Sequence, residues 1–197
     1  MKTKLAGVCS RIASGGTPKS GNPAYYGGDI PWLRTQEINF TDIERTALSI
    51  TDEGLNNSSA QWIPANAVVI AMYGATAGKS AITRIPLTTN QACCNLIIDS
   101  DKADYRYIYY LLRSEYEKLA GLANGGAQQN LNVHIISGYE IELPSLAAQH
   151  AIANILSTLD AKIRNNKKIN HHLPARLATD SSPDMKRGKR ESLIFRN

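Results

Sequence analysis

The spacing of hydrophobic and polar positions changes near residue 100. Before that point the apolar residues form short runs, separated by loops rich in Gly, Pro, Asn and Thr. Short apolar runs bounded by turn residues are typical of β-strands. The pattern predicts strands at 5–9, 30–35, 67–72, 80–85 and 93–98, and a later one at 137–143 that ends at Pro144. It also predicts long loops at 14–28 and 41–57, and a tight turn at 74–78.

Two later segments have helical spacing. From Tyr105 to Leu119 the apolar and tyrosine positions recur at intervals of three and four, which indicates an amphipathic helix with its tyrosines in the core. A second helix is expected after Ser145, its candidate N-cap, and Pro174 should end it. Its apolar and Asn positions alternate in steps of four and three, as in a coiled coil. These positions are Ile152, Leu156, Leu159, Ile163, Asn166, Asn170 and Leu173.

These elements define the expected fold class and domains. We expect an α/β (α+β) domain at 1–146 with several short strands and an amphipathic helix, then a long coiled-coil helix at 147–173 and a basic flexible tail at 174–197. At 1.5 Å per residue the helix is ~40 Å long, more than a domain of this size accommodates along its surface. A protruding arm that binds a partner helix and a terminal helix lying on its own domain both remain open.

Composition limits the class of protein. The 197 residues are 43% hydrophobic and 20% charged, as in globular proteins, and they contain no apolar run long enough to span a membrane. No secretory signal precedes the first strand, and the three cysteines lack the spacing of a zinc site. A reduced, cytoplasmic location is therefore expected.

The positive charge is concentrated at the C-terminal end. Residues 1–160 carry 12 Lys and Arg against 14 Asp and Glu, a net charge of −2, whereas residues 161–197 carry 10 against 3, a net charge of +7. The body of the protein is therefore not a strongly cationic nucleic-acid binder.

Several motifs come close to catalytic signatures without matching them. The segment 74–80 resembles a phosphate-binding loop, but three residues rather than four separate its glycines, and a strand follows it. Asn22-Pro23-Ala24-Tyr25 differs at its third position from the Asn-Pro-Pro-Tyr motif of adenine-N6 methyltransferases. The four histidines lack metal-ligand spacing. We therefore predict no catalytic residues, no metal site and no cofactor.

The loops instead carry many amides and hydroxyls. Asn and Gln side chains pair with adenine edges, while Arg and Lys bind guanine and phosphate. We predict base contacts from the loop polar residues, and contacts to phosphate or guanine from three cations. The residues are Thr35, Gln36, Tyr73, Thr76, Asn90, Gln91, Gln128, Asn130 and Asn132, with the cations Lys19, Arg34 and Lys79. Each could instead cap a turn or a strand end.

Eight short motifs occur in an order that resembles a protein family. They are Gly15-Gly16-Thr17-Pro18, the segment 25–32, Thr35-Gln36-Glu37-Ile38, the segment 50–55, Ser58-Ser59-Ala60, the segment 73–79, the segment 89–93 and Gln128-Gln129-Asn130-Leu131. The series resembles a target recognition domain of the specificity (S) subunit of type I restriction-modification systems. The segment 143–160 is similar to the start of that family's spacer helix.

The resemblance implies a non-catalytic subunit of a type I restriction endonuclease and adenine-N6 methyltransferase complex. Such a subunit reads one half of a bipartite double-stranded DNA target, and it docks methyltransferase (M) subunits, which hold the S-adenosylmethionine. In the full complex it also binds motor-endonuclease (R) subunits. Family members usually have two recognition domains and two helices. This chain has one of each, so we expect a half subunit that pairs with itself, or with a second half subunit, through its helix.

A second function remains open. The chain could be a protein–protein module that occupies the S site of a methyltransferase without reading DNA, as an inhibitor or assembly factor. The net charge of −2 on residues 1–160 favours this alternative, because a phosphate-binding surface is usually basic.

Overall fold

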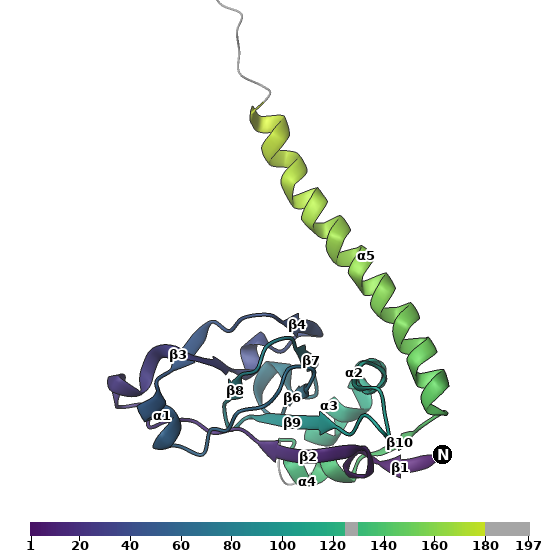
Figure 1. Ribbon diagram of the computed structural model, residues 1–197, viewed down its shortest axis with the longest axis horizontal. Helices are drawn as coiled ribbons and strands as arrows, with labels where there is room; N and C mark the ends of the chain where they lie inside the picture. Colours follow the sequence, from purple (N-terminus) through teal and green to yellow (C-terminus); the bar gives the residue numbers. More distant parts are fainter. Residues whose placement is uncertain (125–129, 180–197) are drawn as a thin grey trace, which may run out of the picture. The chain divides into compact units, whose positions relative to one another are not determined.

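The computed structural model describes residues 1–124 and 130–179 of the chain (Figure 1). The strands are β1 (Lys2–Lys4), β2 (Cys9–Ser14), β3 (Tyr26–Leu33), β4 (Thr41–Ile43), β5 (Leu48–Ile50), β6 (Val68–Ala71), β7 (Ser80–Thr83), β8 (Thr88–Thr89), β9 (Cys93–Ile98) and β10 (Glu140–Glu142). The α-helices are α1 (Asp52–Asn56), α2 (Tyr105–Ser114), α3 (Tyr116–Asn124), α4 (Val133–Gly138) and α5 (Leu146–Thr179). Short 3-10 helices are η1 (Leu5–Val8), η2 (Pro23–Tyr25), η3 (Thr35–Glu37) and η4 (Gly74–Thr76). The predicted mixed α/β class is confirmed.

A five-stranded sheet, in the order β2-β9-β6-β7-β4, organises the domain. Its central strand β6 pairs antiparallel with β9 on one side and with β7 on the other, so that Val69 lies opposite both Asn95 and Ala81. All four residues of β6 are buried. A continuous apolar run is the pattern expected for a strand that is covered on both faces, and the predictions of strands near 67–72, 80–85 and 93–98 are confirmed.

The two faces of β6 contribute to different cores. Val68, Ile70 and Met72 pack in a cluster with residues of α2, α3 and α4. Val69 and Ala71 belong to a second cluster, which includes the end of β3. Successive side chains of a strand point to opposite faces, which explains this division. In Figure 1, β3 and β8 lie to the left of β6 and β9, whereas α2 and α3 lie to the right.

Two predicted strands are wrong in part. Residues 5–8 form η1, because Leu5 and Val8, three positions apart, are both buried on the same side of a 3-10 turn. Residues 133–138 form α4, whose N-terminus is capped by Asn132: its Oδ1 accepts a hydrogen bond of 2.9 Å from the backbone N–H of Ile135. Only the short β10 follows, and it pairs with β1.

Two other segments are more structured than expected. The predicted loop 41–57 contains β4, β5 and α1. The helix predicted from Tyr105 to Leu119 is interrupted at Glu115, so that α2 and α3 are separate. The placement of tyrosines in its core is confirmed for Tyr109, which is 3% exposed.

The last helix, α5, is longer than predicted. It begins after Ser145, whose Oγ accepts a hydrogen bond from the backbone N–H of Ala148, and this confirms the N-cap. The predicted end at Pro174 is wrong, because α5 continues to Thr179. Proline removes one main-chain hydrogen bond, but its φ is compatible with a helix, so it does not by itself terminate one.

The chain divides into two compact units, residues 1–156 and 157–197, and α5 contributes to both. The functional boundary at residue 146 stays a prediction. In the described ranges, no helix combines the length and the apolar character needed to cross a membrane.

The predicted coiled-coil positions of α5 are largely open to solvent. Ile152, Leu159 and Ile163 are 40%, 50% and 52% exposed, and Asn166 and Asn170 are exposed as well. Leu156 is half-buried, and the side chain of Leu173 lies outside the described residues. Two further exposed isoleucines, Ile155 and Ile169, widen the apolar stripe beyond the predicted positions.

Gly15 lies where two backbones meet after β2. A Cβ at this position would overlap the carbonyl oxygens of Thr89 and Asn90. Gly15→Ala should therefore lower the free energy of unfolding by about 2–3 kcal/mol, in the range of overpacking substitutions. Gly21→Ala is the matched control, because nothing lies within 4 Å of its added Cβ. Denaturant unfolding of both variants checks the prediction, which fails if the two midpoints are equal.

Candidate nucleic-acid interface

One end of the five-stranded sheet gathers loops that are far apart in the sequence. In the antiparallel registers, the last residues of β2 and β6, Ser14 and Ala71, lie opposite Cys94 and Cys93 at the start of β9. The first residue of β7, Ser80, lies opposite Ile70. The chain therefore leaves or enters the sheet at the same end in four places.

Main-chain hydrogen bonds join these loops to one another. The N–H of Gly16 donates to the carbonyl of Thr89, and the N–H of Asn90 donates to the carbonyl of Leu33. Met72 donates to the carbonyl of Ala92, and its own carbonyl accepts from Leu131. The joined loops are 15–19, 34–40, 73–79, 89–92 and 130–132, which together we call the loop edge.

Five of the predicted contact residues are exposed on the loop edge. They are Lys19, Gln36, Tyr73, Gln91 and Asn130. Tyr73 is 38% exposed and immediately precedes η4, while Gln36 lies in the middle of η3. The amide oxygen of Gln91 accepts a hydrogen bond from the hydroxyl of Thr17.

Other predicted contact residues hold the loops in place. The hydroxyl of Thr76 donates to the carbonyl of Thr35 at 2.9 Å and so joins η4 to η3, while Thr35 itself is buried. The Oδ1 of Asn90 lies 3.1 Å from the thiol of Cys93, and Asn132 caps α4. The side chains of Thr76, Asn90 and Asn132 are therefore used in contacts within the protein, the kind of role that the sequence left open.

The two remaining cations differ in their surroundings. Arg34 is half-buried, and its Nε has no hydrogen-bond partner among the described residues. The ammonium of Lys79 donates to Oδ1 of Asn39 at 2.8 Å. Gln128 lies outside the described residues.

One of the motifs near catalytic signatures, at residues 22–25, has a structural role. Oδ1 of Asn22 accepts from the N–H of Ala24 and caps η2. Burial raises the pKa of the Cys94 thiol to about 12, so it is protonated at neutral pH. In the part of the chain that the structure describes, no group of three His, Cys, Asp or Glu could hold a metal ion.

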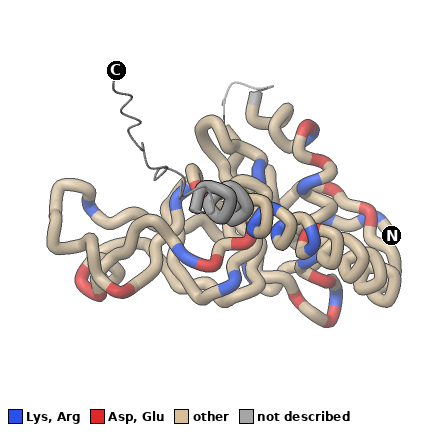
Figure 2. Tube along the Cα trace, turned by 90° about the horizontal axis from the view of Figure 1, so that it is seen from above, with Lys and Arg blue, Asp and Glu red and all other residues tan. Residues whose placement is uncertain are grey.

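An aromatic and cationic cluster lies where the loop edge meets α2 and α3, and of its members only Lys79 was predicted as a contact residue. Phe40 packs edge-to-face on Tyr116, and the cations of Lys79 and Arg113 lie near its ring. The residues come from three separate segments, so no local pattern predicted that they meet. Figure 2 shows that acidic and basic residues are interspersed along the chain. The net charge of the domain therefore says little about where positive charge is concentrated, and local groups of cations say more.

Comparison with known proteins identifies the family. Residues 1–175 match the family described as the type I restriction modification DNA specificity domain. The chain belongs to this family. It is 33% identical over 167 residues to the type I restriction enzyme MjaIX specificity subunit of Methanocaldococcus jannaschii, covering 82% of this chain and 38% of that protein. It is 26% identical over 163 residues to the EcoR124I/EcoR124II specificity subunit of Escherichia coli, covering 80% and 40%.

Solved structures share the fold of this specificity domain. The S subunit from M. genitalium superimposes with a TM-score of 0.64 at 21% identity, over 91% of this chain and 44% of that one. The HsdS subunit from Thermoanaerobacter tengcongensis gives a TM-score of 0.63 at 15% identity, over 86% and 39%. The chain thus spans about two-fifths of the length of the relatives that it matches.

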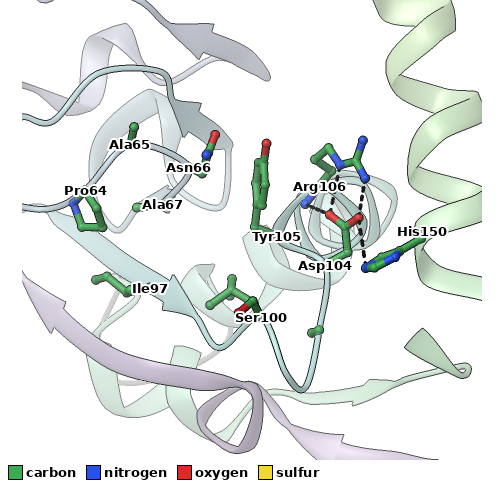
Figure 3. Close-up of a pocket in the computed structure, with 12 residues that line it drawn as sticks. Pro64, Ala65, Asn66, Ala67, Ile97, Ser100, Asp104, Tyr105, Arg106 and His150 are labelled. Carbon is green, nitrogen blue, oxygen red and sulfur yellow. Dashed lines mark hydrogen bonds and ion pairs between the residues drawn. The ribbon is translucent and has the colours of Figure 1, made fainter. Parts of the chain in front are cut away.

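A hollow of about 490 Å³ lies near the other end of β6 and β9 (Figure 3). Its apolar side includes Ala67 and Ile97, and its polar side is formed by Asp104, Arg106 and His150. Figure 3 shows the carboxylate of Asp104 between the guanidinium of Arg106 and the imidazole of His150 on α5. The specificity domain therefore joins the start of α5 to α2 beside this hollow.

A polar network holds this joint. The carboxylate of Asp104 caps α2 and pairs with Arg106, with a shortest N–O distance of 2.6 Å. Arg106 also donates to Oδ1 of Asn154 at 2.8 Å, and the N–H of Asp104 donates to Oε1 of Gln149 at 3.1 Å. The side chains of α5 that make these bonds lie on its first turns, within the unit 1–156.

Asp104 should make stability depend on pH. Burial disfavours its charged form, but the hydrogen bonds and the charge of Arg106 outweigh this, so the pKa of the carboxyl lies below its ordinary value. A lowered pKa in the folded state stabilises the fold above the ordinary carboxyl pKa of about 3.9, and this stabilisation disappears as the pH falls through the lower, folded value.

Asp104→Asn should lower the free energy of unfolding at pH 7 by about 1–2 kcal/mol, because the amide retains the cap but loses the charged hydrogen bonds. The difference in free energy of unfolding between the variant and the unmodified protein should be constant above about pH 5 and become smaller at lower pH. Thermal unfolding across pH measures it. His150→Gln is the control: its imidazole is half exposed and 3.9 Å from the carboxylate, so its effect should be small. If this difference in free energy of unfolding stayed the same at acid pH, the lowered pKa of Asp104 would be contradicted.

Proposed function

We propose that this chain is the DNA-reading half of a type I specificity subunit. The observation that carries the proposal is the loop edge, where exposed Gln36, Tyr73, Gln91 and Asn130 lie on loops joined by main-chain hydrogen bonds, within a chain of the specificity-domain family. Amides on such loops have the donor and acceptor pairs needed to read base edges. The fixed backbone keeps them in register with a duplex.

The proposed complex has three kinds of partner. The chain binds double-stranded DNA through the loop edge and docks a methyltransferase subunit, which supplies S-adenosylmethionine and the chemistry. In the full complex it also binds the motor-endonuclease subunit. The names of the relatives support the role of a specificity subunit, and one solved relative comes from work on the assembly of a type I restriction-modification system.

We further propose that two copies pair through α5. Apolar side chains that are half exposed along one stripe of a helix gain stability when a second helix covers them. Two identical domains related by a two-fold axis present the same loops twice, so the half-sites would be identical and on opposite strands. A gap of several unread base pairs would separate them.

The pairing predicts the oligomeric state. The unmodified chain should sediment as a dimer at micromolar concentration, and Leu159→Asp with Ile163→Asp should make it monomeric, because charges at the helix contact are strongly disfavoured. The two side chains are about half exposed, so the fold of residues 1–156 should survive. Lys168→Asp, on the opposite side of α5, is the matched control and should leave the dimer intact. A monomeric unmodified protein would exclude self-pairing.

The function is tested by the methylome of a host that expresses this chain with its methyltransferase subunit. We expect a bipartite palindromic motif. Gln36→Ala should relax one base position in both half-sites together, a loss of about 1–3 kcal/mol if the amide is bidentate to a base. Asn132→Ala is the control: it should preserve the motif but lower stability by about 1 kcal/mol through loss of the α4 cap.

The result also separates the alternatives. Two different half-sites would mean that the chain pairs with a second, non-identical recognition domain. A methyltransferase complex that assembles but binds no duplex would instead support the protein–protein module. The observation that favours this alternative is the net charge of −2 on residues 1–160.

A further inference from the structure

Arg34 directly follows β3, at a point where the loops of the loop edge are bonded to one another. Two residues before it, the indole N–H of Trp32 donates to the carbonyl of Gly16 at 3.0 Å. The carbonyl of Leu33 accepts from the N–H of Asn90 at 2.9 Å. The residues that precede Arg34 are therefore bonded to two other loops.

The residue after Arg34 is bonded to a third loop. The carbonyl of Thr35 accepts from the hydroxyl of Thr76 at 2.9 Å, and Thr35 is buried. The main chain of Arg34 is held as well, because its N–H donates to the carboxylate of Glu37 at 3.2 Å and its carbonyl accepts from the N–H of Glu37 at 3.1 Å. With bonded loops on either side of it in the chain, Arg34 occupies a fixed position in the middle of the loop edge.

The side chain of Arg34 is half-buried without a partner. Its Nε is enclosed by protein atoms, and its guanidinium makes no hydrogen bond or ion pair among the described residues. The adjacent carboxylate of Glu37 is used by main-chain N–H groups, those of Arg34 and Ala47. A buried donor that has lost water without gaining a protein partner destabilises the fold. A ligand that supplies acceptors would remove this cost.

We propose that Arg34 binds a guanine in each half-site of the DNA target. The inference rests on the proposed function and names one base that the loop edge recognises. Because Nε is enclosed, a ligand can reach only the two terminal nitrogens, Nη1 and Nη2. Their side-by-side donors match O6 and N7 of guanine, the two acceptors in the major groove that arginine contacts most often. Adenine presents a donor where guanine has O6, so it is disfavoured at this position.

Phosphate is the other acceptor that an arginine commonly contacts. Phosphates line the rims of the groove, whereas base edges form its floor. Arg34 precedes η3 directly and lies two residues from Gln36, which the proposed function assigns to a base. Its position between bonded loops, rather than at an outlying tip, therefore favours a base over a phosphate.

The first experiment uses the full chain in complex with its methyltransferase subunit and a duplex that carries the motif from the methylome. Each guanine of the motif is replaced in turn by 7-deazaguanine, which pairs normally but lacks the N7 acceptor. At one position of the half-site this replacement should weaken binding about tenfold or more, the size of one hydrogen bond to a charged group. The complex that contains Arg34→Met should be insensitive to the same replacement.

The second experiment is the methylome of the variants. Arg34→Met keeps the apolar stem and removes the donors, so one G·C position should become degenerate in both half-sites together. Arg34→Lys should restore only part of the preference, because an ammonium lacks the two side-by-side donors. Arg11→Met is the matched control and should leave the motif unchanged, since Arg11 lies on β2 and donates to the carbonyl of Trp62 at 2.9 Å.

Stability separates this role from a structural one. Because the guanidinium has no partner, Arg34→Met without DNA should unfold at a urea concentration no lower than that of the unmodified chain. A side chain that holds the loops together should instead lower the midpoint when it is replaced. Thr76→Val, which removes the hydrogen bond to Thr35, provides that comparison.

Several outcomes would overturn the inference and leave the proposed function standing. One is a motif without any G·C pair, and another is an equal effect of 7-deazaguanine on the unmodified and Arg34→Met complexes. A slope of log affinity against log salt that Arg34→Met flattens by about one unit on motif and scrambled duplexes alike would assign Arg34 to a phosphate. An unmodified complex that binds no duplex would exclude the proposed function and this contact together.

Discussion

The antiparallel pairing of β6 with β9 and β7 is the interaction on which the rest of the domain depends. Each buried backbone N–H and C=O needs a partner, and β6 finds partners on both sides because it is central in the sheet. The same register fixes which strand ends meet. It places the start of β9 beside the ends of β2 and β6, and so it creates the loop edge. The two cores on either face of β6 then hold this arrangement rigid.

The polar residues of the loop edge divide into two groups with different physical roles. Thr76, Asn90 and Asn132 are used inside the protein, where they join η4 to η3, contact Cys93 and cap α4. Gln36 and Tyr73 are exposed on the loops that the first group holds in place. A small number of exposed side chains on a well-held backbone is the arrangement that base recognition needs, because each amide must reach its hydrogen-bond partner in a defined geometry.

The helix α5 meets the domain through polar contacts and carries apolar side chains in solvent. Gln149 and Asn154 bind the network of Asp104 and Arg106, where hydrogen bonds impose direction as well as attraction. Further along, Leu159 and Ile163 are half exposed. The hydrogen bonds position the start of α5 on its own domain. The exposed apolar side chains further along are the surface that the proposed pairing of two helices would cover.

Local patterns in the sequence were sufficient for much of this protein. The apolar runs located β6, β7 and β9, the spacing of four and three located α5, and Ser145 marked its start, because strand and helix periodicity are properties of neighbouring residues. Ordered motifs identified the family. The sequence could not separate exposed Gln36 from the capping Asn132, since both are amides in polar loops. It took part of the segments that form η1 and α4 for strands, because a short apolar run fits a strand and a short helical turn equally well. Nor could it reveal that Phe40, Lys79 and Arg113 meet, because these residues are distant in the chain and come together only in the folded domain.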